Sequence, residues 1–443
     1  MSSPVRRQME DPVAGAAEFL MRLGIGVLMI AGPVGALASR RLMVALVPVG
    51  AALMIASVLI SPRQGVFRGL GQALASPLGV VALALLVWIG ASILWTPFQP
   101  VAVERFAKML GTLAMVTLAI AILPTHVRTP NLNLLPIGLG AACVGVLLLV
   151  PLNLIDARPL EGPEPGVVER IAIMAAVLLW PALGALAVRE RWISAGILAV
   201  VATAAILLVR TPPAYGGLAA GAIVCAFGLA GGRRFALVLA VVIATLLVSA
   251  PALALLTERF APQLGIEALP LMRSFTAWAG MIADDGVRTL TGYGFHSAVR
   301  GLQTGFIPFG APRGAIFQMW FDLGVFGALL TAFLLARVVM AAGAATPPAS
   351  GFLLATAVSI IAIGAFSAVG LQLWWLTIVG LAAIASALLL KGQYRTDRPS
   401  ADRPTAERRM VECPPSERSP SDRPVAERPT ADFVRETSAR PAL

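Results

Sequence analysis

Four arginines stand in a comparatively polar stretch of the chain, Arg273, Arg288, Arg300 and Arg313, and Arg210 lies at the end of an apolar run before it. A guanidinium is a planar fork of donors that binds two phosphate oxygens at once. Such a set is typical of a site that holds a pyrophosphate or stabilises a phosphate leaving group. Loop arginines are also often solvated or paired with lipid phosphates, and this is expected of Arg288, which belongs to no motif.

Few other groups in this stretch are suited to chemistry. His296 has an ordinary pKa near 6.5 and is a candidate general base, although a solvated loop position is an equally ordinary place for it. Gln318 and Asp322 are four residues apart and share one helix face, where a carboxylate near the helix start suits the helix dipole. Asp284 and Asp285 resemble a solvated turn. We find no carboxylate cluster with magnesium-ligand spacing, so metal-independent chemistry is predicted.

The elements that carry these residues are apolar. Hydrophobic residues make up 58% of the 443 residues and charged residues 13%, against about 25% charged in soluble domains. Runs of about 18–22 apolar residues are long enough to cross a bilayer. We therefore predict an all-α polytopic membrane protein with about twelve transmembrane helices, or eleven if the last two runs form one hairpin. The runs are 20–38, 42–60, 78–95, 107–123, 134–152, 170–187, 192–209, 214–230, 235–256, 315–337, 352–369 and 371–390.

The distribution of Lys and Arg among the short loops predicts the orientation. Cytoplasmic loops are enriched in these residues, and a moderate bias places both termini in the cytoplasm. Residues 1–390 then form one transmembrane domain, whose longest loop, 257–314 between helices 9 and 10, is periplasmic. The net charge of +11 does not predict nucleic-acid binding, because there is no basic face with interleaved aromatics.

Residues 391–443 differ from the rest. Acidic residues recur at every fifth position, most are followed by Arg, and proline occurs in nearly every unit. Proline removes backbone donors and few apolar side chains are left to form a core, so a disordered cytoplasmic tail is predicted. The three cysteines, Cys143, Cys225 and Cys413, have neither zinc spacing nor the number needed for a disulfide framework.

The residues from 269 to 330 form a recurring pattern. Arg273 precedes Trp278, and a glycine turn is followed by Ser297 and Arg300. The next helix opens with a sequence close to L-Q-x-W-x-E-L-G-x-x-G, here Phe317-Gln318-Met319-Trp320-Phe321-Asp322-Leu323-Gly324 and then Gly327. These elements resemble the O-antigen ligase and polymerase superfamily of bacterial membrane enzymes. Weaker similarities lie upstream, at Leu94-Trp95-Thr96, at Glu169-Arg170 through Trp180-Pro181, and at Arg210 through Gly217.

The resemblance implies transfer of a glycan from undecaprenyl pyrophosphate to a sugar hydroxyl, at the periplasmic face of a bacterial inner membrane and without a cofactor. The acceptor is a lipid A core in a ligase and another lipid-linked glycan in a polymerase. By position in the motifs, Arg313 is an expected catalytic residue, and Arg210, Arg273 and Arg300 are the expected pyrophosphate ligands. His296 is the other expected catalytic residue: the base, if one is needed, comes from His296 or from a loop carboxylate.

Five further residues are expected to support the site structurally. They are Gly292 and Gly294 of the glycine turn, and Gln318, Trp320 and Asp322 of the following helix. The glycine turn is not a nucleotide fingerprint, because no βαβ unit surrounds it.

The chain departs from the family just before that helix. Relatives carry H-P-H-N where this chain has Ala311-Pro312-Arg313-Gly314, so Arg313 replaces a histidine and Gly314 an asparagine. The change favours a polymerase or an inactive relative over a standard ligase. The rival class is a secondary transporter or lipid-linked oligosaccharide flippase, which would show inverted repeats and charges at the membrane midplane. We see no similarity between the halves, and the charges cluster at helix ends.

The predicted orientation can be tested with reporter fusions. A phosphatase fused at Gly301 is expected to be active, and a fluorescent protein fused at Ala442 is expected to fluoresce, because the first site is periplasmic and the second cytoplasmic. Phosphatase activity from a fusion at Ala442 would contradict the orientation and the placement of the site with it.

Overall fold

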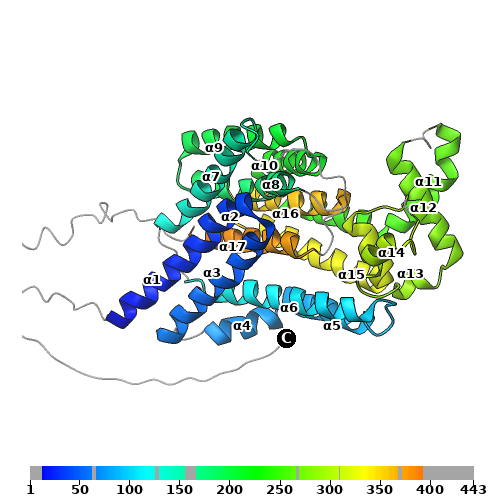
Figure 1. Ribbon diagram of the computed structural model, residues 1–443, viewed down its shortest axis with the longest axis horizontal. Helices are drawn as coiled ribbons and strands as arrows, with labels where there is room; N and C mark the ends of the chain where they lie inside the picture. The colour runs from blue at the N-terminus through cyan, green and yellow to red at the C-terminus, as the bar shows by residue number, and fades with distance from the viewer. Residues whose placement is uncertain are drawn as a thin grey trace, which may run out of the picture. The chain divides into compact units, whose positions relative to one another are not determined.

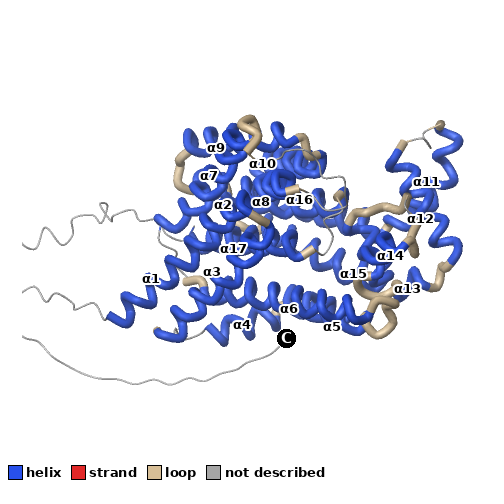
Figure 2. Tube along the Cα trace, in the orientation of Figure 1, coloured by secondary structure: helices blue, strands red, loops and turns tan. Residues whose placement is uncertain are grey.

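The computed structural model describes residues 12–61, 66–124, 129–154, 166–265, 269–308, 310–367 and 372–392, and every regular element within them is a helix (Figure 1 and Figure 2). The predicted all-α class is therefore confirmed for this part of the chain. The predicted tail lies outside the described residues from residue 393 on, and Cys413 with it.

The helices follow one another along the described residues. The first half of the chain contains α1 (Pro12–Gly26), η1 (Val27–Ala31), α2 (Gly32–Ala38), α3 (Arg40–Ile60), α4 (Val66–Ala75), α5 (Pro77–Ser92), α6 (Gln99–Ile122), η2 (Thr129–Asn133), α7 (Leu134–Leu149), α8 (Val167–Ala187) and α9 (Trp192–Val209). The second half contains α10 (Pro212–Val248), α11 (Ala250–Leu264), α12 (Pro270–Asp284), α13 (Arg288–Thr291), α14 (Ser297–Thr304), α15 (Ala315–Gly343), α16 (Ala349–Phe366) and α17 (Leu373–Gly392).

Many of these helices are suited to a bilayer. Among the described residues, ten helices are long and apolar enough to cross a membrane, or eleven if one bent pair counts as a single span. Their outer surfaces are apolar as well: Ile193 and Val200 of α9 are 83% and 69% exposed. Large aliphatic side chains in such numbers on a helix surface require a hydrocarbon environment. The chain is a multi-pass membrane protein.

The bent pair is the first difference from the predicted runs. We expected one span over 78–95, but α5 ends at Ser92 and meets the short helix before it at 71°. Ser76 causes the bend, because its hydroxyl accepts a hydrogen bond from the amide of Gly79 (3.1 Å) and Pro77 follows as the first helical residue. The short α5 leaves Trp95 and Thr96 in a turn.

The second difference concerns α10, which is 37 residues long and breaks at Gly232 (φ +51°, ψ −138°). Before the break, Gly217 lies against Ile363 and Gly228 against Gly351, so this arm is antiparallel to α16. After the break, contacts run from Ala236 beside Gly343 to the carbonyl of Leu247, which accepts from the Trp320 indole (2.9 Å), along α15. The two predicted runs 214–230 and 235–256 therefore correspond to two arms of one interrupted helix.

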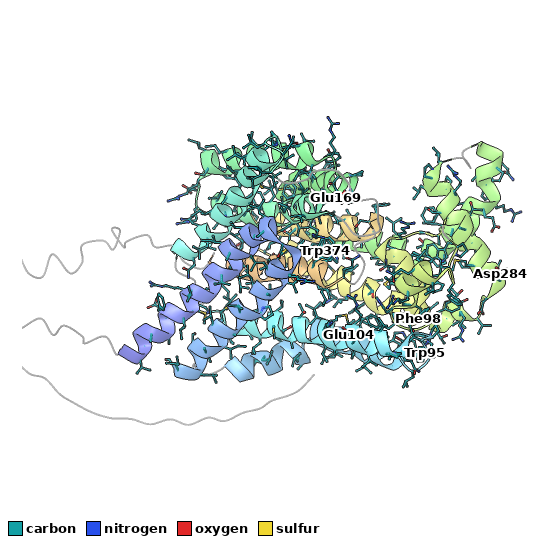
Figure 3. All side chains as sticks on the ribbon, in the orientation of Figure 1. Trp95, Phe98, Glu104, Glu169, Asp284 and Trp374 are labelled. Atoms are coloured by element: carbon teal, nitrogen blue, oxygen red, sulfur yellow. The ribbon has the colours of Figure 1, made fainter. Side chains whose placement is uncertain are left out.

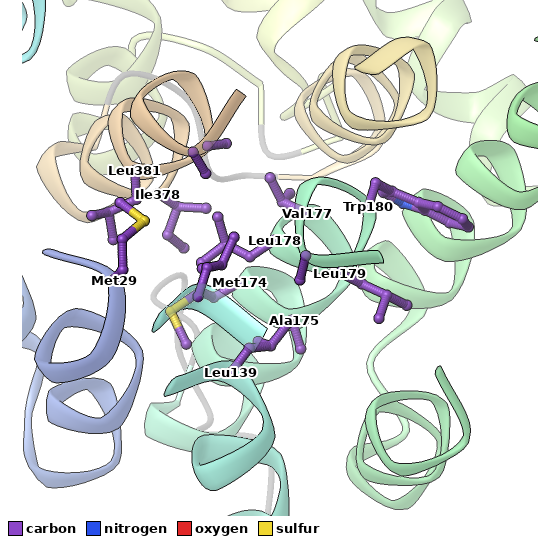
Figure 4. Close-up of a cluster of buried hydrophobic side chains, with 14 of the residues drawn as sticks. Met29, Leu139, Met174, Ala175, Val177, Leu178, Leu179, Trp180, Ile378 and Leu381 are labelled. Carbon is purple, nitrogen blue, oxygen red and sulfur yellow. The ribbon is translucent and has the colours of Figure 1, made fainter. Parts of the chain in front are cut away.

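Helix α8 forms the centre of the largest apolar cluster. It is buried over nearly its whole length, and 94% of its most apolar window is inside the protein. Figure 4 shows Met174, Val177 and Leu178 of α8 facing side chains of neighbouring helices, among them Leu139 and Ile378. A helix that is apolar all round is expected in such a position, since it has no face left for solvent.

The helix ends gather into two groups. At one end, the Lys391 ammonium donates to the carbonyls of Ile120 (3.2 Å) and Leu123 (2.8 Å), which joins the ends of α17 and α6. Gly184 near the end of α8 lies against Leu389 and Phe352 at this same end. At the opposite end, Gly314 at the start of α15 lies against Ala365 at the end of α16. This grouping brings the ends of α6, α8 and α17 to one end of the bundle. The alternation of the loops and the side that faces the cytoplasm stay predictions.

The segment predicted as a long loop is largely helical, and this corrects our expectation. The run predicted to end at residue 256 is divided: α10 ends at Val248, and α11 begins at Ala250 with Pro251 near its start. Helices α11, α12 and α14 share an apolar cluster with the first turns of α15, in which Trp278 packs edge-on against Phe317 with ring centroids 5.4 Å apart. Helices α12 and α14 are amphipathic but only 15 and 8 residues long, so a search for apolar runs long enough to cross a bilayer does not find them.

Candidate functional site

The candidate site is organised by an interruption of α15 at Gly324, whose backbone is left-handed (φ +64°, ψ −159°). An interruption removes the intrahelical donors for the carbonyls of the preceding turn. Here those carbonyls have donors from elsewhere: Phe321 O accepts from Tyr293 N (2.8 Å), Asp322 O from Gly294 N (2.9 Å), and Leu323 O from the Trp88 indole (2.9 Å). The break thus binds the glycine turn and α5 to α15.

The glycine positions at this junction are required by close backbone approach. Gly292 and Gly294 have φ values of +74° and +96°, which residues with a Cβ atom rarely adopt. A Cβ on Gly292 would lie 2.3 Å from the Asp322 carbonyl oxygen, and one on Gly324 would lie 2.4 Å from the Leu290 carbonyl oxygen. Both distances are much shorter than a van der Waals contact. The turn and the interrupted helix can therefore pack together only if positions 292 and 324 are glycine.

Asp322 holds the residues that follow the turn. Its side chain is 3% exposed, and its two carboxylate oxygens accept from the backbone amides of His296 (2.9 Å) and Ala298 (2.7 Å). These amides open α14, so the carboxylate caps the positive end of that helix from another helix. The geometry agrees with the supporting role expected of Asp322.

The end of α5 closes the other side of the turn. The Ser92 hydroxyl accepts from the amide of Phe295 (3.1 Å), and the hydroxyls of Thr96 and Ser297 are 2.9 Å apart. The Trp95 indole donates to the carbonyl of Gly292 at 3.3 Å. Figure 3 shows Trp95 between α5 and α6, on the side of the bundle that carries α13 and α14. Segments about 200 residues apart in the chain therefore meet in one network.

His296 lies inside this network. It is 9% exposed and has left-handed backbone (φ +68°), which is unusual for a residue with a side chain. Burial lowers its pKa to about 4, and the nearby positive charges of Arg105 and Arg300 act in the same direction. The imidazole is therefore neutral at pH 7 and is able to accept a proton. Arg105 is brought here by Phe106, which packs edge-on against Phe295 with centroids 6.2 Å apart.

Arg300 adjoins the network, whereas Arg313 lies in the loop before α15. Arg300 is half-buried on α14, one turn after His296, and its guanidinium donates to the Gln303 side chain (3.0 Å). Arg313 has an exposed side chain, and its carbonyl accepts from the Gln318 amide (2.9 Å). Gln318 therefore fixes the backbone that presents Arg313, which fits the support expected of it.

Arg210 and Arg273 are not joined to the network by the contacts of the described residues. Arg210 is exposed and left-handed (φ +57°) at the end of α9, and Arg273 is exposed on α12. Trp320, the remaining expected support, donates its indole hydrogen to Leu247 and so ties α15 to the second arm of α10. Of the three arginines predicted to bind the pyrophosphate, Arg210, Arg273 and Arg300, only Arg300 is therefore brought to the network by the described contacts.

Several residues beside the turn were not predicted from the sequence to belong to the site. Ser92 and Trp88 lie on the α5 side, and their signal was the group of polar and amphipathic residues at the end of an apolar run. Asp285, Arg288 and Tyr293 line a pocket beside the turn, together with apolar side chains of α11, α12 and α15. Arg288 is exposed as expected, yet its guanidinium lies over the Tyr293 ring, 5.6 Å from the centroid.

No family model, curated protein or solved structure matches this chain. Within the described ranges there is also no group of three or more His, Cys, Asp or Glu side chains placed to hold a metal ion. Metal independence remains a prediction of the sequence.

The interruption of α15 is open to a direct test. Gly324→Ala is expected to destabilise the purified protein by about 1–3 kcal/mol or more, because the new methyl group meets the Leu290 carbonyl in a left-handed backbone. Gly111→Ala on α6 is the matched control, since a Cβ there meets nothing within 4 Å and helix propensity improves. Equal thermal midpoints for Gly324→Ala and wild type in detergent would contradict the described junction.

His296 predicts a pH dependence of stability. Its folded pKa of about 4 lies below the ordinary 6.5, so between these values the unfolded chain binds a proton that the folded chain does not. Stability is therefore expected to fall as the pH drops from about 6.5 towards 4. His296→Asn, which tolerates the left-handed backbone, should lose less stability than wild type between pH 8 and pH 4.5. Identical losses of thermal midpoint would show that His296 does not titrate in this window.

Proposed function

We propose that this protein transfers a lipid-linked glycan to a sugar hydroxyl at the outer face of the membrane. One observation carries the proposal. Residues that resemble separate motifs of the O-antigen ligase and polymerase superfamily, Trp95-Thr96, the glycine turn and Trp320–Gly324, meet in a single hydrogen-bonded network. Motifs that matched by accident would have no reason to converge in space from two distant parts of the chain, residues 95–96 and 292–324.

The chemistry follows from the charges around the turn. The acceptor oxygen attacks the anomeric carbon, the bond from that carbon to the phosphate oxygen breaks, and undecaprenyl pyrophosphate leaves with the electron pair. Arg300 and Arg105, whose charges both act on His296, are proposed to stabilise the charge that develops on the phosphate. The neutral His296 is the candidate acceptor for the hydroxyl proton. Arg313 is proposed to contact the pyrophosphate from the loop before α15.

A polymerase fits better than a ligase, since Arg313 and Gly314 stand where ligases of the family carry histidine and asparagine. The rival class, a transporter or flippase, requires a substrate pathway through the membrane with ionisable groups near its middle. In the described part of the chain, the arginines discussed here lie at helix ends or in the α11–α14 segment, and this distribution favours chemistry at one face.

The proposal predicts the effect of arginine substitutions on glycan transfer. Arg300→Ala and Arg313→Ala should each reduce transfer roughly a hundredfold, the usual effect of removing one preorganised donor of about 3 kcal/mol. Arg313→Lys should also impair transfer, because lysine keeps the charge and loses the two-pronged fork. The measurement is the polysaccharide ladder made in host cells whose own copy of the gene is deleted, with protein level followed by immunoblot.

Arg259→Ala on α11 is the matched control for these substitutions. Arg259 is an exposed arginine in the same helical segment and takes no part in the network. A full ladder is expected from this variant. Full ladders at normal protein level from both Arg300→Ala and Arg313→Ala would refute the proposed role of the site.

A further inference from the structure

Helices α10 and α11 are two parts of one helical path that bends at a proline. Ser249 between them has right-handed helical backbone (φ −82°, ψ −1°). Its amide donates to the Thr245 carbonyl (2.8 Å), and its carbonyl accepts from the Leu253 amide (2.9 Å). The hydrogen bonds therefore continue from α10 into α11. Pro251 has no N–H for the carbonyl four residues before it, that of Leu247, and such a gap bends a helix.

Trp320 holds the bend in place. Its indole donates to the Leu247 carbonyl (2.9 Å), the group that Pro251 leaves without a helical donor. Trp320 is buried near the start of α15, so α15 fixes the direction in which α11 leaves the bundle. In Figure 1 and Figure 2, α11 and α12 run across the direction of α6, which is a candidate membrane span. A helix that runs across the spans lies along the membrane surface.

The surface of α11 carries two apolar stripes. Ala254 and Ala261 are seven residues apart and buried, and α11 packs along α12. Beside this stripe, the side chains of Leu253, Leu256 and Phe260 are 41%, 51% and 45% exposed. Their spacing of three and four residues places them on one helix face. This second stripe is the exposed one, and three large apolar side chains in a row require a partner.

The exposed stripe of α11 continues the outer surface of α10. Val242 and Leu246 are exposed apolar residues of that membrane-spanning helix. Steps of four, seven and three residues lead from Val242 through Leu246 and Leu253 to Leu256, so the four share one face of a continuous helical path. A surface that meets hydrocarbon on α10 therefore extends onto α11.

The length of α11 decides how it meets the lipid. Its 15 residues rise only about 22 Å, which is too short to cross about 30 Å of hydrocarbon. Contact along its side is what remains for the exposed stripe.

The outer face of α12 is different in character. Arg273, Thr276 and Asp284 are exposed there, at spacings of three and eight residues that place them on one side of the helix. The hairpin of α11 and α12 thus has an apolar side and a polar side. This division is typical of an element at the membrane interface, with one side in the acyl chains and the other in water.

We propose that α11 docks on the acyl chains of one membrane leaflet through Leu253, Leu256 and Phe260, and that α12 covers it on the side of the water. Continuity with the lipid-facing surface of α10 favours the bilayer over a protein partner as the occupant of this stripe. The contact holds the hairpin against the membrane surface. It follows from the membrane location of the chain and goes beyond the proposed function, because it holds for any reaction at the candidate site.

The inference is tested by spin-label accessibility in the full chain reconstituted into phospholipid nanodiscs. Cys143, Cys225 and Cys413 are replaced by alanine, and a nitroxide is attached at one new cysteine. The test variants are Leu256→Cys and Phe260→Cys. The matched controls are Thr276→Cys on the polar side of the same hairpin and Val242→Cys on α10.

Oxygen concentrates in the bilayer and a nickel chelate stays in water, so the ratio of their collision rates with the nitroxide reports its surroundings. At positions 256 and 260 this ratio should be several-fold higher than at position 276 and close to that at position 242. A ratio equal to that at position 276 would place α11 in water and overturn the inference. Low collision rates with both reagents would also overturn it, since they would show that a protein surface covers the stripe.

A second measurement needs no cysteine-free chain and therefore decides the matter even if that background fails to fold. Benzoylphenylalanine in place of Leu256, in an otherwise unchanged chain, should form a light-induced adduct with the mass of one phospholipid. The same substitution at Val242 is the positive control. A cross-link from position 256 to another protein chain, or no lipid adduct there when position 242 gives one, would refute the docking of α11 on lipid.

Discussion

The structure depends on how the carbonyls freed at Gly324 find donors. An interrupted helix inside an apolar bundle is tolerated only where protein groups replace the missing hydrogen bonds. Here the replacements are two amides of the glycine turn and the Trp88 indole. The two amides tie the glycine turn to α15 and the indole ties α5 to it. The interruption of α15 therefore also creates the junction of α5, the turn and α14.

That junction fixes one short turn from several directions. Asp322 caps α14 and sets the backbone of His296. Phe321, the residue before it, stacks on the Tyr293 ring. A change in the position of this part of α15 would therefore move both the glycine turn and the backbone of His296.

The sequence predicted the class of fold and most helices, because apolar runs long enough for a bilayer leave little ambiguity. It also singled out Gly292, Gly294, Trp320 and Asp322 through their motif. It did not predict the interruption at Gly324, since glycine in an apolar run more often signals close helix packing. The break in α10 at Gly232 lies in the short segment 231–234, with two arginines, that separates two predicted runs. The sequence pattern also does not distinguish Arg300, which lies beside His296, from Arg210 and Arg273. The distances of these two arginines from the candidate site depend on how α9 and α12 pack.

A bound dianionic ligand would change the pKa of His296. In the free protein, burial and the charges of Arg105 and Arg300 make protonation of the imidazole unfavourable. Under the proposed function, a pyrophosphate bound to these arginines brings negative charge that offsets theirs, and the imidazole becomes more basic. Since coupling between two binding equilibria is reciprocal, proton uptake at His296 then favours the bound pyrophosphate by the same free energy. Binding of the donor substrate would thus raise the pKa of His296. That pKa would rise further as negative charge grows on the leaving group.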